Sequence, residues 1–475
     1  MKRLIGAGTV VVAAIASFGT TYAACRLCGA QAAPAILAAI LAISLSRRGS
    51  PASAAHLAAS VAGLASLAVV ATGIGRLLHS LPVLGAAVFT AGMFLSVWLR
   101  NFGGRARYAG AVIAMPLVAM LVVPVATRAA PGGPLVDLAL GIFAGVTALG
   151  YVTVVQWLAR RAGVGVVAAE RPADAAKAEQ PKRAGLSPPT RMALQMAVAL
   201  AAAFAVGFSV FPAHWGWAVL TAFIVCSGAR GRGDALYKGV LRLAGAVAGT
   251  LAAAALGHVW APAGIAEASA IFIVLFVGLW LRDYNYAYWA SCTTLILAIL
   301  QGANAGGIAL LGVRLEAILL GALCGVAAAW FVVPIRTEAI VRRRIADALR
   351  AFDEVVAQAH LSDGERTRRL ALFEHRMAEL ELVAPPVRWH RRIFASGAGA
   401  EHPAQWIELT RSLGSHAAAF GPEGDRKRSM AVRRAIGISR RAIANHGNPD
   451  KSSDDVTVGA SLCSLRDVVA SGHDR

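Results

Sequence analysis

A hydrophobic pattern occurs twice along the chain, and this duplication constrains the fold more than any other feature of the sequence. Residues 97–102 read VWLRNF, and residues 279–284 read LWLRDY. Each copy ends one apolar run and precedes another. The basic loop at 47–50, upstream of the first copy, has a counterpart at 230–233, upstream of the second. We therefore expect two equivalent halves, each built from hydrophobic helices.

The composition is that of a membrane protein. Hydrophobic residues make up 57% of the chain and charged residues 15%, whereas soluble globular proteins carry about 25% charged residues. The net charge of +20 does not indicate a nucleic-acid partner, because Lys and Arg accumulate in cytoplasmic loops beside anionic lipid. The sequence predicts an all-α polytopic protein whose main partner is the lipid bilayer.

Twelve apolar runs approach the length that a transmembrane helix requires, about 20 residues. The predicted spans are 4–24, 27–45, 54–78, 81–99, 108–127 and 135–159, then 191–211, 215–229, 239–261, 264–282, 284–301 and 307–334. We expect about twelve transmembrane helices arranged as two six-helix repeats. The first membrane half is 1–159 and the second is 191–334.

Two polar regions complete the predicted organisation. Residues 160–190 are basic and punctuated by proline, which is typical of a linker. Residues 335–446 are rich in Arg, Glu and Ala at helical spacing and predict an α-helical cytoplasmic region. Residues 447–475 are rich in Gly, Ser and Asp, so we expect a disordered tail.

The positive residues predict the orientation. They gather in the loops on one side of the spans, together with the linker and the tail, so both termini should be cytoplasmic. The first span also resembles a signal peptide, but we expect a retained helix because the second half opens with one in the same place. Cys25 and Cys28 form a lone CxxC, which leaves a periplasmic disulfide open and is too unspecific to predict a metal site.

A series of short motifs crosses residues 191–335. In chain order they are Trp217–Ala218–Val219–Leu220–Thr221, Arg242–Leu243–Ala244–Gly245 with Gly249–Thr250, Tyr284–Asn285–Tyr286–Ala287–Tyr288, and Arg314–Leu315–Glu316 with Gly321, Gly325 and Pro334. This series resembles the second membrane half of the fusaric acid resistance protein-like family, the aromatic acid exporters of bacterial inner membranes. Two departures are the Cys226–Ser227–Gly228 segment, where the family usually has proline, and cytoplasmic parts that are short for the family. The first half resembles a degenerate copy without a counterpart of Arg242.

The resemblance implies a multi-pass protein of the bacterial inner membrane that exports aromatic carboxylates, linked to protons or to the membrane potential. Export systems of this kind leave open a periplasmic adaptor protein and a homo-oligomer as partners. The sequence has no Walker loop, dinucleotide fingerprint, HExxH or nucleophile elbow. We therefore expect no cofactor, no metal ion, no catalytic residues and no enzymatic activity.

Two arginines are candidates for binding an organic anion. Arg314 lies about two turns into the last predicted span, where an arginine costs about 2.5–3.5 kcal/mol unless something compensates it. A guanidinium there could bind a carboxylate in bidentate fashion, or it could extend to the membrane surface. Arg242 opens the 239–261 span and could bind the same substrate or anchor that span at the cytoplasmic surface.

Two carboxylates are candidates for proton coupling. Glu316 and Asp137 occupy nearly equivalent places in the last helix of each half. A carboxyl group in a low-dielectric environment has a raised pKa and can carry a proton near neutral pH. The alternative is a hydrated carboxylate close to a loop.

Aromatic residues suit an aromatic substrate. The candidates are Trp217, with Thr221 one turn later on its helix, and Tyr284 and Tyr288 in the aromatic stretch. Stacking on such rings is worth about 0.5–1.5 kcal/mol beyond area burial. The alternative is the belt of aromatic residues that membrane proteins place at the bilayer interface.

The sequence is consistent with two functions. The first is a secondary transporter that exports aromatic carboxylates or similar weak organic anions. The second is an envelope scaffold or regulatory membrane protein that acts through its cytoplasmic tail. The sequence names neither the substrate nor the coupling ion.

Overall fold

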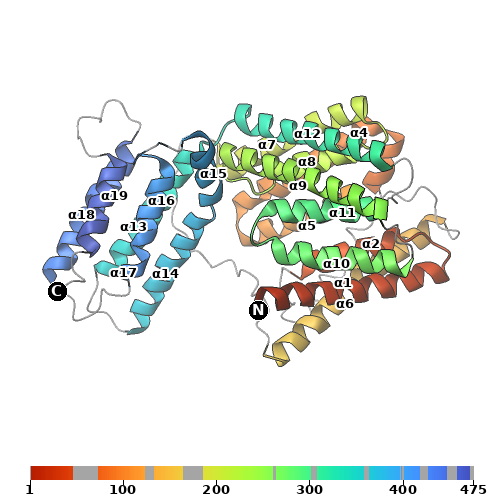
Figure 1. Ribbon diagram of the computed structural model, residues 1–475, viewed down its shortest axis with the longest axis horizontal. Coiled ribbons are helices and arrows are strands. Elements are labelled where there is room, and N and C mark those ends of the chain that lie inside the picture. Colours follow the sequence, from red (N-terminus) through yellow and green to blue (C-terminus); the bar gives the residue numbers. More distant parts are fainter. Residues whose placement is uncertain are drawn as a thin grey trace. The chain divides into compact units, whose positions relative to one another are not determined.

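The computed structural model describes most of the chain. The described residues are 2–46, 73–122, 133–163, 186–259, 264–300, 307–357, 363–395, 397, 399, 401–417, 426–446 and 457–470. Within these ranges the regular structure is entirely helical (Figure 1). Residues 164–185 of the predicted linker (160–190) lie outside them.

The chain divides into two compact units, and the boundary near residue 334 is where the composition changes. Unit 1 comprises Met1–Ser227 and Lys238–Val333, and unit 2 comprises Gly228–Tyr237 and Pro334–Arg475. Six helices of the described residues are long and apolar enough to cross a membrane, and four shorter helices are also apolar. The all-helical membrane fold is therefore confirmed, whereas the count of about twelve spans remains a prediction.

Unit 1 contains these apolar helices, apart from residues 232–237 at the start of one of them, which belong to unit 2. In chain order its elements are α1 (Lys2–Leu27), α2 (Ala33–Leu45), α4 (Pro82–Trp98), η1 (Leu99–Phe102), α5 (Gly104–Val122), α6 (Gly133–Arg161), α7 (Pro188–Val210), α8 (Trp215–Cys226), α9 (Arg232–Val259), α10 (Ile265–Leu281), α11 (Tyr286–Leu300) and α12 (Gly307–Phe331). Gly228 follows α8 with φ of +63°, a left-handed conformation that glycine adopts without strain. The Cys226–Ser227–Gly228 segment thus ends this helix without the family's proline.

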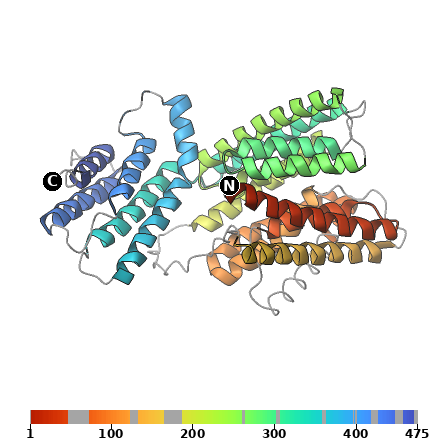
Figure 2. The same cartoon turned by 60° about the horizontal axis from the view of Figure 1, so that its bottom comes forward.

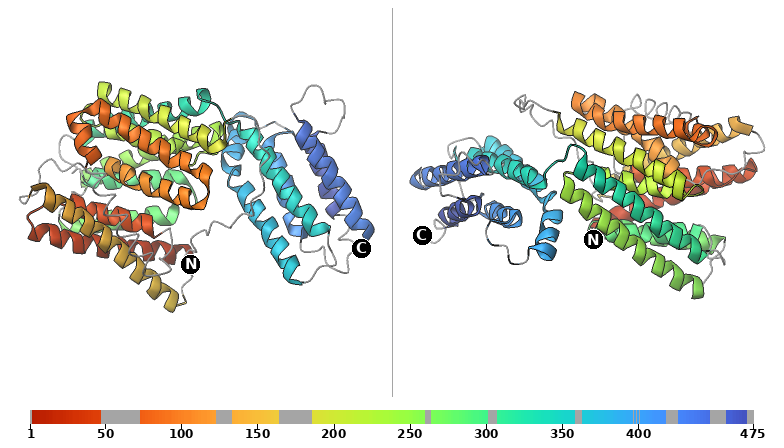
Figure 3. Two further views of the ribbon diagram at one scale, coloured as in Figure 1. Left: turned by 180° about the vertical axis from the view of Figure 1, so that it is seen from behind. Right: turned by 90° about the horizontal axis from the view of Figure 1, so that it is seen from above.

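The helices of unit 1 pack in two similar sets. In the first half α1, α2 and α6 pack together and α4 packs on α5; in the second half α7, α8 and α12 pack together and α10 packs on α11. The halves also meet through matching elements, because α4 packs on α7 and α10 packs on α1. Figure 2 shows α1 beside α6, and the left view of Figure 3 shows α4 beside α7.

Glycines bring several of these helices unusually close. A Cβ on Gly321 of α12 would collide with the carbonyl oxygen of Ala218 on α8, and a Cβ on Gly325 would lie 2.9 Å from Val225. A Cβ on Gly245 or on Gly249 of α9 would likewise collide with backbone oxygens of α11. The glycines at four-residue spacing therefore form two close-packed helix contacts, as their small-xxx-small pattern predicts. We call them the α8–α12 seam and the α9–α11 seam.

Unit 2 has its own hydrophobic core. Its helices are α13 (Thr337–Val356), α14 (Asp363–Glu381), α15 (Ala384–Phe394), α16 (Pro403–Ser412), α17 (Gly414–Ala417), α18 (Arg426–Asn445) and α19 (Val458–Ala470). Val341, Ile345 and Leu349 recur every four residues along α13, and they pack with Trp406 and Ile407 of α16. The expected helical region is therefore a packed domain.

The structure corrects the expected disorder of residues 447–475. Residues 458–470 form α19, which packs on α16 and α18. Leu462, Leu465 and Val469 are buried at helical spacing. The Gly, Ser and Asp content of the whole segment concealed this short apolar pattern, which is stabilised by tertiary packing.

The structure also moves the start of α9. The predicted span begins at residue 239, whereas the helix begins at Arg232. Asp234 lies in its first turn, and its carboxylate accepts a hydrogen bond from the backbone N–H of Arg230 at 3.0 Å. A carboxylate is favourable at a helix N-terminus, so a segment predicted as a basic loop is helical instead.

The α8–α12 seam can be tested with two glycines of the same helix. We expect Gly321→Ala to destabilise unit 1 by about 1–3 kcal/mol, because the added methyl group must separate two backbones. Gly312→Ala is the matched control, since a Cβ there meets nothing within 4 Å. Thermal unfolding in detergent can be monitored by the loss of the monodisperse peak in size-exclusion chromatography. The midpoint temperature should be lower for Gly321→Ala and unchanged for Gly312→Ala. Equal midpoints would contradict the seam.

A histidine at the start of α16 predicts a pH dependence in unit 2. The Nδ1 atom of His402 accepts the N–H of Ala404 at 3.1 Å and so caps the helix. Burial and the nearby charges of His390 and Arg391 hold the pKa of His402 below that of an ordinary histidine. The folded state thus favours the neutral ring of His402. The stabilisation of unit 2 by this cap is complete above a pH of about 6.5, the pKa of histidine in the unfolded chain, and it is lost as the pH falls through the lower pKa of the folded state.

We therefore expect faster hydrogen exchange in the first turn of α16 at pH of about 5.5 than at about 7.5, after correction for intrinsic rates. His402→Asn should abolish this difference, because asparagine caps a helix without titrating in this range. An unchanged pH response in that variant would assign the effect to another group.

Candidate functional site: a pair of buried arginines

Arg314 is buried within unit 1 rather than extended to a surface. Its side chain is 2% exposed, and it lies on α12 beside the α8–α12 seam. Neighbouring residues of the two helices, Ala317 and Ala218, belong to one small apolar cluster with Phe211. The guanidinium carbon lies 5.6 Å from the centre of the Trp217 ring, within the range of a cation–π interaction.

Arg242 is buried in the same way on α9. The predicted span would have placed it at a helix end, but the earlier start of α9 leaves it about ten residues inside the helix. Its side chain is 4% exposed. One terminal nitrogen, Nη1, donates to the hydroxyl of Thr293 on α11 at 3.3 Å. The close α9–α11 seam brings these two side chains together, so Arg242 is not a surface anchor.

The two arginines carry charge that the described residues do not neutralise. No described carboxylate lies within ion-pair distance of Arg242 or Arg314. Nε and Nη1 of Arg314 and Nε of Arg242 are buried without hydrogen-bond partners in the described structure. The two arginines lie on neighbouring helices, because a Cβ on Gly239 of α9 would lie 3.3 Å from Val326 of α12, and their guanidiniums repel each other electrostatically. We call them the arginine pair.

A buried, uncompensated charge is costly, since a missing ion-pair partner destabilises a fold by about 3–5 kcal/mol. An anion seated between the guanidiniums would supply both the missing charge and the missing hydrogen-bond acceptors. The arginine pair therefore presents charge and N–H donors that could bind an anion.

The other predicted substrate contacts divide into two groups. Trp217 and Thr221 lie on α8, and the Thr221 hydroxyl, which is buried, donates to the carbonyl oxygen of Trp217 at 2.9 Å. Tyr284 and Tyr288 are 62% and 51% exposed. The structure thus brings Trp217 to Arg314 and leaves both tyrosines on an outer surface of the described fold.

The candidate coupling residues are not part of the arginine pair. Glu316 is exposed on α12, and the helical spacing of about 200° turns it away from Arg314. Asp137 lies within α6, and its side chain is outside the described residues.

Sequence reasoning missed three side chains around the arginine pair. The His214 ring stacks on Trp217 with centres 4.4 Å apart. Tyr286 is within electrostatic range of Arg242, and Thr293 holds Arg242 directly. Tyr286 and Thr293 are two turns apart on α11, a spacing that places them on one face. That spacing was a usable signal, but the more exposed tyrosines of the same stretch obscured it.

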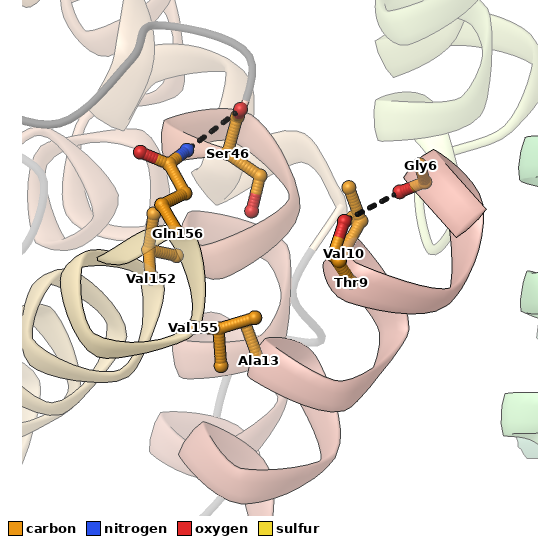
Figure 4. Close-up of a pocket in the computed structure, with 8 residues that line it drawn as sticks. All are labelled: Gly6, Thr9, Val10, Ala13, Ser46, Val152, Val155 and Gln156. Atoms are coloured by element: carbon orange, nitrogen blue, oxygen red, sulfur yellow. Dashed lines mark hydrogen bonds between the residues drawn. The ribbon is translucent and has the colours of Figure 1, made fainter. Parts of the chain in front are cut away.

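A pocket lies between α1, α6 and the end of α2, and neither arginine of the pair lines it (Figure 4). Its polar groups are neutral. Nε2 of Gln156 donates to the carbonyl oxygen of Ser46 at 3.1 Å, and the Thr9 hydroxyl donates to the carbonyl oxygen of Gly6 at 2.9 Å. Without a charged lining residue this pocket does not suit an organic anion.

The comparisons with known proteins bear on the same half of unit 1. Residues 196–328 match the family model described as fusaric acid resistance protein-like. No curated protein matches the chain. The matched segment contains α8, α9, α10 and α11 and both members of the arginine pair.

The apolar helices and this match together describe a multi-pass membrane protein of the transporter or resistance class. The resemblance to the fusaric acid resistance protein-like family is thus confirmed for residues 196–328, the greater part of the second membrane half.

Proposed function

We propose that this protein is a secondary transporter that exports weak organic anions, aromatic carboxylates among them, from the cytoplasm across the bacterial inner membrane. The observation that carries the proposal is the arginine pair, two buried guanidiniums without a described counter-ion. The family match supports a transporter. In this proposal both termini and the helical unit 2 are cytoplasmic, as the distribution of positive residues predicts.

The depth of the arginine pair in its helices supports a role in transport. Arg314 lies about 10 Å from the start of α12, and Arg242 lies about 7.5 Å beyond Tyr237, the last residue of α9 that belongs to unit 2, at 1.5 Å per residue. The hydrocarbon core of a bilayer is about 30 Å thick. A charged residue at such depth faces the interior of the protein or a polar pathway, where it serves a function.

The packing of unit 1 supports the two-repeat organisation that this function uses. Each half contains one group of three packed helices and one packed pair. Across the halves, α4 packs on α7 and α10 packs on α1. Transporters built from such repeats bind their substrate near the middle of the membrane and expose it alternately to each side. A homo-oligomer and a periplasmic adaptor protein are further partners that we propose for this export path.

The membrane potential is a sufficient driving force for a monoanion. An inside-negative potential moves one charge outward with about 2.3 kcal/mol per 100 mV. Because about 1.4 kcal/mol corresponds to tenfold, this energy supports an outward gradient of roughly fifty-fold. Antiport of a proton through Glu316 or Asp137 would add to it.

We expect Arg314→Ala to abolish export without removing the protein from the membrane. Loss of the guanidinium removes the charge that binds the substrate, so counterflow of a radiolabelled aromatic acid in proteoliposomes should fall by at least about tenfold. Arg161→Ala is the matched control: Arg161 also lies over a tryptophan, Trp157, at 4.2 Å, but it is exposed at the end of α6.

Export at the wild-type rate by Arg314→Ala would remove this residue from the mechanism. Absence of flux for every weak acid tested, with wild-type protein in sealed vesicles, would instead favour the scaffold function.

Glu316→Gln tests proton coupling separately from anion binding. If Glu316 carries the proton, flux driven by a pH gradient alone should fall to the background level, whereas flux driven by a potassium diffusion potential should persist. Asp283→Gln is the control, since Asp283 is an exposed carboxylate in a turn between two helices. Equal pH-driven flux in all three proteins would exclude Glu316 from coupling.

A further inference from the structure

The arginine pair has the charge of two cations rather than one. Arg242 lies on the α9–α11 seam and Arg314 lies beside the α8–α12 seam, so the two guanidiniums come from separate helix contacts. Both are more than nine-tenths buried. Each keeps at least one N–H group without an acceptor, so a ligand that satisfies only one guanidinium leaves the other charged and unpaired.

The sequence provides few residues that could neutralise the pair from within. Acidic residues are scarce before residue 334. Among those that the structure describes with their side chains, Asp283 and Glu316 are exposed, Glu267 is partly exposed in the first turn of α10, and Asp234 accepts a hydrogen bond at the start of α9. The described fold therefore assigns the second negative charge, like the first, to a ligand.

The groups around the arginine pair are better suited to binding a charged group of a ligand than to stacking on its aromatic ring. The indole of Trp217 already contacts the His214 ring and the Arg314 guanidinium. Tyr284 and Tyr288, the other predicted stacking residues, are exposed. In the described structure the groups left to bind a ligand at the pair are N–H donors.

We propose that the arginine pair is a site for divalent organic anions, which place one carboxylate on Arg242 and a second on Arg314. The inference rests on the proposed function and narrows its substrate class. Thr293 fixes one nitrogen of Arg242, so the remaining donors of that side chain are held in place for the second carboxylate. A monocarboxylate would satisfy Arg314 or Arg242, but not both.

Benzoate and phthalate test this inference, because they share one ring and differ by one adjacent carboxylate. Binding of each to the full-length protein in nanodiscs would be measured by calorimetry, at neutral pH and constant ionic strength. We expect phthalate to bind at least about tenfold more tightly than benzoate, since only phthalate can neutralise both guanidiniums. This comparison uses wild-type protein and does not depend on the folding of a variant.

Arg242→Gln should remove the difference between the two ligands, because the affinity for phthalate should fall to the level of benzoate when only one guanidinium remains. Arg282→Gln is the control for general electrostatics. Arg282 lies near the ring of Trp289, 5.9 Å from its centre, and it is not a member of the pair, so its loss should preserve the preference.

Three results would overturn the inference: benzoate binding as tightly as phthalate, Arg242→Gln weakening both ligands equally, or Arg282→Gln abolishing the preference as fully as Arg242→Gln does. Each leaves the proposed function intact if benzoate is still bound and exported. Failure of both ligands to bind wild-type protein, together with absence of flux, would instead count against the proposed function itself.

Discussion

The close approach of helix backbones at four glycines determines which side chains are buried inside unit 1. Gly321 and Gly325 bring α12 against α8, and Gly245 and Gly249 bring α9 against α11. In lipid there is little hydrophobic force between helices, so such contacts rely on van der Waals packing over small residues. The arginine side chains extend from the same helices, and both are buried in the interior of the unit.

Burial of these side chains is a cost that the described fold does not offset. A fold selected for stability alone would replace a buried, unpaired guanidinium with an apolar group of similar size, a change that is often stabilising. Two such groups in one half of the membrane unit, each with unsatisfied N–H donors, are better explained by a ligand than by packing. Local departures from the rules of stable folds are expected at functional sites.

Much of this architecture could be predicted from the sequence, and the failures have identifiable causes. Hydropathy located the apolar helices, and small-xxx-small spacing located both seams. Hydropathy could not show that α9 begins at Arg232, because the capping role of Asp234 depends on a backbone contact with Arg230. The burial of Arg242 follows from that earlier start, so its role could not be separated from that of a surface anchor. Average composition likewise concealed α19, which only packing against α16 and α18 makes evident.

The sequence predicted the kinds of residue in the candidate site, but it did not predict all of the individual residues that lie there. Arg314 is recognisable from the sequence because an arginine inside a hydrophobic span is energetically costly. Tyr286 and Thr293 carry no such cost, since threonine and tyrosine are ordinary in membrane helices. Their spacing of two turns places them on one face of α11, but only the packing of α9 against α11 shows that this face meets Arg242. The aromatic stretch drew attention to Tyr284 and Tyr288 because of their number, whereas the structure leaves both exposed.

The division of the arginine pair between two seams has a mechanical consequence. Helices locked backbone to backbone cannot slide past one another without parting, so each seam moves as a rigid piece, with Arg314 attached to one and Arg242 to the other. Any rearrangement that opens a passage and spares both contacts must alter the gap separating the guanidiniums. In the proposed transporter, an anion bound to both guanidiniums would favour the arrangement of the two seams in which the distance between them fits the anion.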